Sequence, residues 1–294
     1  MNKEQELKDI VKARYTKIAE QGKAENASSC CGATPTTNKV YNIMMDDYSE
    51  TQGYVEDADL GLGCGLPTQF AKIKAGDTVI DLGSGAGNDC FVARHETGAE
   101  GKVIGIDFTP IMIKKARLNA EKLGYNNVEF RAGDIDDMPV NNDVADVIVS
   151  NCVLNLVPNK QKVISEIYRV LKPGGHFSIS DVVLKGHLPK SLQEDAEMYA
   201  GCVAGAIQRT DYLQFITNQG FKNIQIQKEK PIIIPNDILS KYLSVDEVSA
   251  FNNGGAGIFS ITVYAEKPGT LEDQNPVTFS EAQTSCCSPS SGCC

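Results

Sequence analysis

The sequence predicts an α/β fold of the doubly wound kind, with a mostly parallel seven-stranded sheet and helices on both of its faces. Two observations carry this prediction. Apolar, strand-like segments alternate with amphipathic helices from residue 78 to residue 183, which is the pattern of parallel strands joined by crossover helices. A glycine-rich turn, DLGSGAG at 81–87, lies between the first strand and a helix that starts near Asn88, where doubly wound folds bind their ligands.

The strands are predicted from short runs rich in branched apolar residues. In chain order they are expected at TVIDL (78–82), KVIGID (102–107), a segment that ends before AGDI (132–135), VADVIVSN (144–151), HFSISDVV (176–183), NIQIQKEK (223–230) and IFSITVYAEK (258–267).

Two connecting helices are well marked. The first spans 110–123, where Thr109 can cap the helix and Pro110 suits its first turn. Its apolar face consists of Ile113, Ala116, Ala120 and Leu123. The second helix, PNKQKVISEIYRVL at 158–171, is expected to end at KPGG.

Composition changes divide the chain into three predicted parts. Residues 1–77 are polar, helical at the start, and expected to form an N-terminal cap or arm. Residues 78–267 form the ligand-binding domain, with a helical acceptor-binding insert at 188–219 that has no obvious strand. Residues 268–294 are rich in Pro, Ser, Thr and Gly and predict a mobile, cysteine-rich tail.

The bulk properties exclude two classes of partner. The chain has 294 residues and a net charge of −10, which argues against an electrostatic hold on nucleic acid or on an anionic membrane. No apolar run approaches the ~18 residues of a membrane span, and the charged N-terminus does not resemble a signal peptide. We therefore expect a soluble, cytoplasmic protein.

The glycine turn and two further acids predict a nucleotide-like ligand. A G-x-G-x-x-G dinucleotide loop would need glycine at 88, but the residue there is asparagine. Asp81 precedes the turn, and Asp107 ends the second strand, where a carboxylate meets ribose hydroxyls in doubly wound folds. Asp134 follows the third strand, where an adenine amino group could be read. An NAD enzyme or a degenerate nucleotide fold is the alternative.

Ten cysteines are unusual for a chain of this class. No C-x-x-C pair or paired histidine motif suggests zinc, and His95, His176 and His187 are scattered and expected to be structural or exposed. Cys90 lies beside Phe91 on the helix after the glycine turn and is expected to pack in the core.

Three other cysteines are placed to converge on the ligand. Cys152 lies at the carboxyl end of the fourth strand, Cys202 in the helical insert, and Cys64 in the arm that enters the first strand. Three thiols suit a soft, thiophilic ion, and trivalent arsenic binds three sulfurs while it keeps a lone pair. The alternative is that Cys152 and Cys202 are small buried apolar residues.

With these residues in view, the sequence resembles the arsenite S-adenosylmethionine methyltransferases. The similar segments are VIDLGSGAGNDCFVA, IVSNCVLNLVPNKQKVISEIYRVLKPGG and GCVAGA, within residues 40–220. The resemblance implies a Rossmann-like class I methyltransferase that binds S-adenosylmethionine as methyl donor and has no permanent metal. The residues implied to hold S-adenosylmethionine are Asp81, Gly83, Ser84, Gly85, Gly87, Asp107, Asp134, Ile135 and Asn151.

The resemblance also implies that Cys64, Cys152 and Cys202 bind arsenic and that an N-terminal cysteine, Cys31 or Cys30, is their redox partner. On this basis we expect Cys152 and Cys202 to be the lasting pair, and Cys64 to release arsenic and bond to Cys31. Arsenite and methylarsenite are the expected substrates, and thioredoxin or glutathione the expected reductant. Animal members carry a tyrosine where this chain has Leu62.

Two other functions are compatible with the sequence. The first is a methyltransferase that acts on carbon or oxygen of a small metabolite, such as a quinone precursor. The second is a metalloid-binding protein without catalysis.

Overall fold

The structure, a computed structural model, describes residues 3–21, 47–186, 190, 202, 205–233, 236–253 and 257–269. The expectations about Cys30, Cys31, His187 and the tail cysteines fall on residues outside these ranges.

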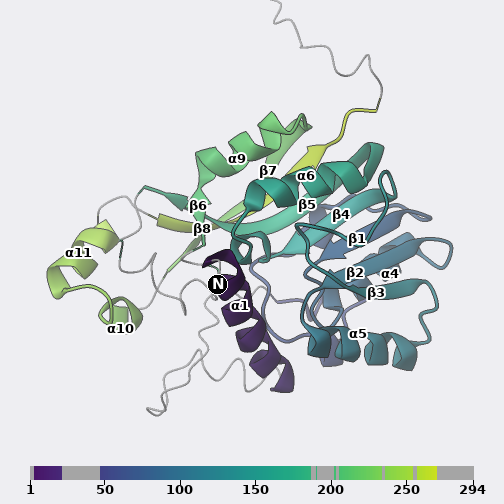
Figure 1. Cartoon of the computed structure of the whole chain (residues 1–294), viewed down its shortest axis with the longest axis horizontal. Coiled ribbons are helices and arrows are strands. Elements are labelled where there is room, and N and C mark those ends of the chain that lie inside the picture. The colour runs from purple at the N-terminus through teal and green to yellow at the C-terminus, as the bar shows by residue number, and fades with distance from the viewer. Residues whose placement is uncertain are drawn as a thin grey trace, which may run out of the picture.

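The described residues form an eight-stranded sheet (Figure 1). Its order is β3-β2-β1-β4-β5-β8-β7, and the short strand β6 pairs with β5 off this path. Pairing is parallel from β3 to β5, and β8 runs antiparallel to both of its neighbours. The strands are β1 (Thr78–Leu82), β2 (Lys102–Asp107), β3 (Val128–Ala132), β4 (Ala145–Asn151), β5 (Leu171–Lys185), β6 (Ile207–Gln208), β7 (Lys222–Ile232) and β8 (Gly257–Glu266). The predicted doubly wound, mostly parallel sheet is confirmed, and β6 is one strand more than the sequence predicted.

Helices cover both faces of this sheet and its upper edge (Figure 1). They are α1 (Lys3–Glu20), η1 (Glu56–Ala58), α3 (Pro67–Phe70), α4 (Asn88–Thr97), α5 (Pro110–Leu123), η2 (Leu154–Leu156), α6 (Lys160–Val170), α9 (Arg209–Asn218), α10 (Asn236–Leu239) and α11 (Val245–Asn253).

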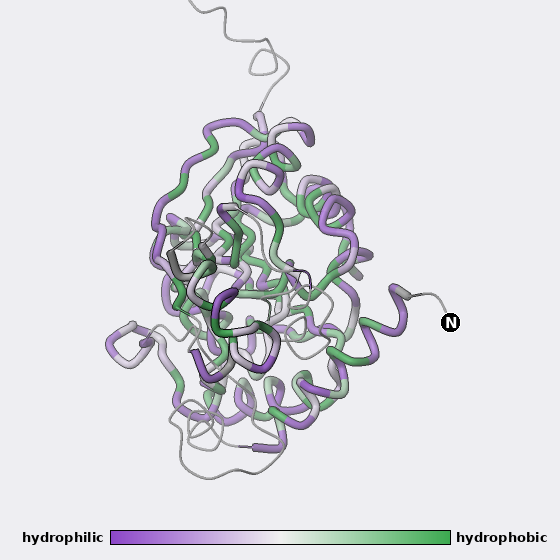
Figure 2. The backbone as a smooth tube through the Cα atoms, turned by 90° about the vertical axis from the view of Figure 1, so that its left-hand side faces the viewer, coloured by the Kyte–Doolittle hydropathy of each residue, from purple (hydrophilic) through white to green (hydrophobic). Residues whose placement is uncertain are grey.

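Two hydrophobic cores separate the sheet from its helices. On one face α6 and α9 pack on the strands, with Ile167 and Phe177 fully buried between them. On the other face α4 and α5 pack through Phe91 and Ala116 against Val147. The hydrophobic stretches accordingly lie mostly inside the molecule in Figure 2. Strands β1, β2 and β4 are buried on both faces, as parallel strands between two helical layers must be.

The bounds of α5 match the prediction, but its N-terminus is held differently. Thr109 occupies the N-cap position, yet its side chain makes no capping hydrogen bond. Its backbone N–H instead donates to Asp107 Oδ1 at 2.7 Å. Gly124 ends the helix in the left-handed conformation at φ +68°, as a C-terminal glycine commonly does. Leu123 is 37% exposed, so the apolar face ends one turn earlier than predicted.

Two further boundaries differ from the sequence prediction. Helix α6 ends at Val170 and β5 begins at Leu171, so the KPGG segment belongs to the strand. The cause is pairing across the sheet, because Gly174 N–H donates to the Lys267 carbonyl and Lys267 N–H donates to that of Gly175. The described part of the predicted helical insert contains β6 as well as α9.

A third hydrophobic cluster lies above the carboxyl ends of the strands. It joins α1, α10, α11 and the start of β8 to the three cysteines Cys64, Cys152 and Cys202. Helix α1 is held there by the Lys8 ammonium, which lies 3.1 Å from Asp136 Oδ2. Within the described ranges, no helix has the length and apolarity needed to cross a membrane.

We expect a buried and an exposed leucine of this fold to differ in how much their substitution by alanine lowers the free energy of unfolding. Leu171 is fully buried and Leu118 is 48% exposed. Leu171→Ala should reduce the free energy of unfolding by about 2–5 kcal/mol, because it leaves a cavity in the core. Leu118→Ala should change it by less than about 0.5 kcal/mol. Urea denaturation measures both, and similar losses would show that the core assignment of Leu171 is wrong.

Candidate functional site

The glycine turn between β1 and α4 requires glycine at two positions. Gly83 and Gly87 have φ values of +68° and +101°, in the left-handed region that glycine adopts without strain. A Cβ added at Gly83 would lie 2.4 Å from Val153, and one at Gly87 would lie 2.9 Å from the Phe91 ring. The turn therefore keeps its backbone close to neighbouring groups and open to a ligand. Gly87 shapes the turn and is not among the lining residues of the two cavities described below.

Asp107 joins this turn to the start of α5. One carboxylate oxygen accepts the Gly85 N–H at 3.0 Å, and the other accepts the Thr109 N–H at 2.7 Å. Burial raises the pKa of Asp107, and these two N–H groups partly offset the effect. The carboxylate still has free lone pairs, so it can accept hydrogen bonds from the hydroxyl groups of a ligand.

A continuous cleft passes over the turn. One cavity is lined by Asp107, Asp134 and Ile135 on one side and by Cys152 on the other. A second cavity shares four lining residues with it: Leu62, Gly83, Gly85 and Asn151. An elongated ligand can therefore lie across the glycine turn, with its middle beside Cys152.

The second cavity is acidic. Asp59, Asp81 and Asp89 line it. Burial raises the pKa of Asp81 well above its usual range, and the Asp89 charge raises it further. Burial likewise raises the pKa of Asp89, to about 6. Buried carboxylates of this kind favour a bound cation, because it compensates the cost of their desolvation.

Two polar side-chain atoms in the acidic cavity lack a hydrogen-bond partner among the described residues. Ser84 Oγ and Asn88 Oδ1 are buried and make no hydrogen bond with any residue that the structure describes. Both residues line the acidic cavity. Since a buried polar group without a partner is costly, these atoms indicate a ligand that forms hydrogen bonds there.

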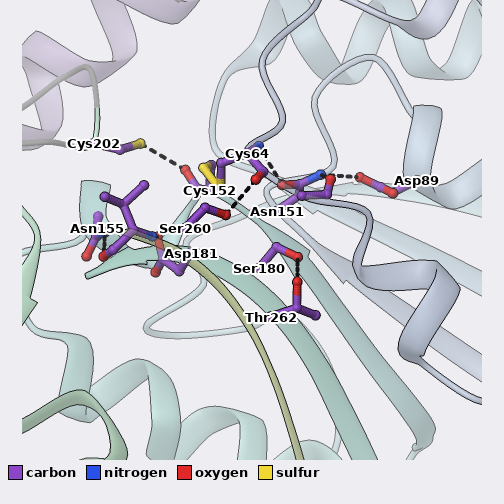
Figure 3. Close-up of a disulfide and its surroundings, with 12 residues drawn as sticks. Cys64, Asp89, Asn151, Cys152, Asn155, Ser180, Asp181, Cys202, Ser260 and Thr262 are labelled. Atoms are coloured by element: carbon purple, nitrogen blue, oxygen red, sulfur yellow. Dashed lines mark hydrogen bonds between the residues drawn. A yellow bond between two sulfur atoms is a disulfide. The ribbon is translucent and has the colours of Figure 1, made fainter. Parts of the chain in front are cut away.

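The three predicted cysteines lie close together (Figure 3), and Cys152 is the one that lines the cleft. Cys64 and Cys152 form a disulfide, and the Cys202 thiol donates to the Cys152 carbonyl oxygen at 3.1 Å. All three side chains are buried. Among the described residues there is no open three-ligand site, because two of the three sulfurs are bonded to each other.

The disulfide partner differs from the one expected. Cys64 was expected to bond to Cys31, but in this structure it bonds to Cys152. The physical reason is that the Cys64 backbone is held beside the end of β4. Asn151 Oδ1 accepts the Cys64 N–H at 3.0 Å, and Ser260 Oγ donates to the Cys64 carbonyl at 2.6 Å.

Two of the cysteines have a strained backbone. Cys152 and Cys202 have φ values of +58° and +67°. This left-handed conformation costs a residue with a Cβ on the order of 1–2 kcal/mol. Such strain persists where the surroundings enforce it, and it is concentrated at functional sites.

Cys202 carries a proton at neutral pH. Burial, and then the nearby Asp181 carboxylate, raise the pKa of its thiol to about 12. The Arg14 charge and a hydrogen bond from Tyr15, both on α1, act in the opposite direction. Cys202 would therefore bind a metalloid by losing its proton to a leaving hydroxide rather than as a free thiolate.

The other predicted residues fall in three groups. Asp134 lines the cleft, but its carboxylate also lies 3.6 Å from Lys8 Nζ. Cys90 is fully buried, as predicted, and its thiol donates to Asp81 at 3.2 Å. His95 and His176 make structural contacts, to Gln52 and to the Ala71 carbonyl.

Sequence reasoning missed many lining residues of the cleft, including four with side chains that can interact with a ligand. These four are Lys8, Tyr15, Tyr48 and Asp89. Asp89 follows the glycine turn directly, so its place in the first turn of α4 was a usable signal. The other three come from the N-terminal 48 residues, whose polar composition gave no indication of where they pack.

Comparison with known proteins defines the class of this site. The model of the methyltransferase domain family matches residues 73–229, so the fold and the cleft are those of an S-adenosylmethionine-dependent class I methyltransferase. An arsenite methyltransferase of Halobacterium salinarum is 39% identical over 90% of this chain and 67% of its own length. The chain belongs to the arsenite methyltransferase family.

Two further relatives agree. An arsenite methyltransferase of Aquipseudomonas alcaligenes is 33% identical over 81% of this chain and 68% of its own length. The crystal structure of an arsenic(III) S-adenosylmethionine methyltransferase from Chlamydomonas reinhardtii superposes with a TM-score of 0.60, at 34% identity, over 72% of this chain and 70% of its own.

The cleft fits S-adenosylmethionine. Asp107 can accept from the ribose hydroxyls, and the acidic cavity suits the ammonium of the methionine end. Ser84 Oγ, which otherwise has no partner among the described residues, can bond to the same end. The sulfonium would then lie where the two cavities meet, near Cys152.

We expect Asp107→Ala to weaken binding of S-adenosylmethionine by about 1.5–3 kcal/mol, the usual effect of losing a charge-assisted hydrogen bond. Calorimetric titration measures the affinity directly. An affinity equal to that of the native protein would show that Asp107 does not contact the cofactor.

The pKa of Asp89 makes cofactor binding depend on pH. This carboxyl has a pKa of about 6 without ligand, so it loses its charge as the pH falls through that value. Because an ammonium binds the charged form better, affinity for S-adenosylhomocysteine should weaken below about pH 6. Asp89→Asn should lower the affinity roughly tenfold at neutral pH and flatten this dependence. An unchanged pH profile in the variant would assign the effect to another group.

Proposed function

We propose that this protein transfers methyl groups from S-adenosylmethionine to thiol-bound trivalent arsenic, converting arsenite to methylarsenite and then to dimethylarsenite. One observation carries the proposal. Three cysteines from segments far apart in the sequence meet at the point of the cleft where the methyl donor would lie. The names of the relatives support arsenite as the substrate.

Binding of arsenite needs no separate base. Each thiol condenses with one hydroxyl of arsenous acid, so a sulfur–arsenic bond replaces an oxygen–arsenic bond and water leaves. Three thiols therefore give a trithiolate and three waters, with the thiol protons carried away in the water. Protonated thiols such as Cys202 suffice for this exchange. The arsenic keeps a lone pair, which is the nucleophile.

In the methyl transfer itself, the protein's contribution is to position the two reactants. Bound S-adenosylmethionine supplies a methyl group on a sulfonium, which is already activated. Cys152, which lines the cleft, holds the arsenic lone pair toward this methyl group, while Asp107 and the glycine turn hold the other partner. Holding two reactants at contact distance in the correct orientation accounts for a large part of such a rate enhancement.

Turnover requires a reductant. Each methylation formally removes two electrons from arsenic, and formation of one disulfide between two cysteines returns them. A closed Cys64–Cys152 disulfide leaves Cys202 as the only free thiol of the three, so it must be opened before the next arsenite binds. We propose thioredoxin or glutathione as the reductant. This need supports a cytoplasmic location, where thiols are kept reduced.

Cys31 or Cys30 remains the proposed additional redox partner. We also propose that the chain has three parts: a cap at residues 1–77, a methyltransferase domain at 78–267 and a cysteine-rich tail at 268–294.

Incubation of the protein with arsenite, a dithiol and S-adenosylmethionine should yield methylated arsenic, detectable by chromatography with mass spectrometry. Methylation of a quinone precursor instead, or arsenic binding without methylation, would contradict the proposal.

Cys152→Ser should abolish methylation of both arsenite and methylarsenite. Cys152 is the cysteine adjacent to both others, and without it the remaining sulfurs hold arsenic too loosely to direct its lone pair. The variant should still bind S-adenosylhomocysteine, which controls for folding. Methylation of methylarsenite at a nearly native rate would make Cys152 a packing residue only.

A further inference from the structure

The amide side chain of Asn151 lies between the cofactor cleft and the Cys64 arm (Figure 3). Asn151 is the last residue of β4 and directly precedes Cys152. Its Oδ1 accepts the Cys64 N–H at 3.0 Å, and its Nδ2 donates to the Gly65 carbonyl at 2.7 Å. One side chain thus binds the backbone on both sides of the Cys64 side chain.

The glycines next to Cys64 make this close approach possible. A Cβ added at Gly63 would lie 2.6 Å from Asn151 Nδ2, and one at Gly65 would lie 2.5 Å from Ser180 Oγ. Both distances are shorter than any real contact of a Cβ. The GCG segment therefore packs directly against the side chains of Asn151, at the end of β4, and of Ser180, within β5.

Both cysteines are anchored through their backbones to the same edge of the sheet. Cys152 N–H donates to the Ser180 carbonyl at 2.8 Å, and Cys64 is held by Asn151 and by the Ser260 hydroxyl. The two thiols are thus fixed relative to each other by polar contacts that involve neither sulfur.

The Asn151 amide is itself oriented by two residues. Its Nδ2 donates to the Tyr48 hydroxyl, and it lies 3.3 Å from Asp89 Oδ2. The Tyr48 hydroxyl also lies 2.9 Å from both Asp89 carboxylate oxygens. The orientation with the amide nitrogen toward these oxygens leaves Oδ1 for the Cys64 N–H.

We infer that Asn151 is a positioning residue, which sets the separation of the Cys64 and Cys152 thiols by holding the Cys64 backbone against the end of β4. A rigid pair has a high effective concentration, so it closes on a shared arsenic atom, or as a disulfide, with little loss of chain entropy. The use of these thiols to bind arsenic rests on the proposed function, while the positioning of the thiols by Asn151 does not.

The test measures the closing of the thiol pair without arsenic. The full-length protein is equilibrated with mixtures of reduced glutathione and glutathione disulfide. In this exchange one Cys64–Cys152 bond forms while the glutathione disulfide takes up two electrons and two protons to give two thiols. Free thiols are trapped by alkylation, and the linked and alkylated peptides of Cys64 and Cys152 are quantified by mass spectrometry.

Asn151→Ala should lower the equilibrium constant for closing by about tenfold, which makes the reduction potential about 30 mV less negative. Ser260→Ala, which frees the Cys64 carbonyl, should shift it in the same direction. The matched control is Ser178→Ala, because Ser178 Oγ donates to the Pro67 carbonyl of the same arm at 2.8 Å but does not contact Cys64. It should leave the potential unchanged.

Three results would overturn the inference: a native potential in Asn151→Ala, an equal shift in Ser178→Ala, or no linked peptide of Cys64 and Cys152 in the native protein. None of them depends on methylation. If the protein failed to methylate arsenic while Asn151→Ala showed the shift, the proposed function would be wrong and the positioning role would stand.

Discussion

The parallel pairing of β1 with β2 and β4 is the constraint on which the site depends. In this register Leu82 lies beside Ile106 and Ser150, so the three strands end at one edge of the sheet. The glycine turn, Asp107 and Cys152 lie at these strand ends and are therefore close together. If these strands ran antiparallel, successive strands would end at opposite edges of the sheet, and these groups would lie far apart. Here backbone hydrogen bonds place the groups proposed to hold the cofactor beside those proposed to hold the acceptor.

The two sides of the site differ in their electrostatic character. The cavity lined by Asp59, Asp81 and Asp89 is acidic and suits a cation, while the three cysteines are surrounded by hydrophobic residues of α1, α10 and α11. Burial keeps the Cys202 thiol protonated and raises the pKa of the Asp89 carboxyl to about 6. A cationic donor and a neutral acceptor, arsenous acid, therefore each find the environment that costs least to desolvate. Leu62 lies where the two cavities meet and contributes to the enclosure without adding a polar group.

The sequence was sufficient where the information is local. Runs such as TVIDL and the spacing of the glycines predicted β1 and the turn. The predicted convergence of Cys64, Cys152 and Cys202 came instead from the fold class, in which ligands bind at the carboxyl ends of the strands. The sequence was insufficient where a contact joins distant segments. The bond from Cys64 N–H to Asn151 spans 87 residues, and it decides that Cys64 lies beside Cys152. Thr109 is a local exception, because Asp107, only two residues before it, accepts its backbone N–H while its side chain makes no capping hydrogen bond.

The left-handed backbone at Cys152 and Cys202 has a consequence for the evolution of this chain. Glycine would relieve the strain at either position, but at Cys152 it would also remove the disulfide to Cys64, which stabilises the fold by more than the strain costs. The Cys202 thiol is free, so its strain has no such compensation. A library sorted for thermal stability in the absence of arsenic should therefore gain glycine at 202 and keep cysteine at 152, and the fold would outlast the three-thiol site.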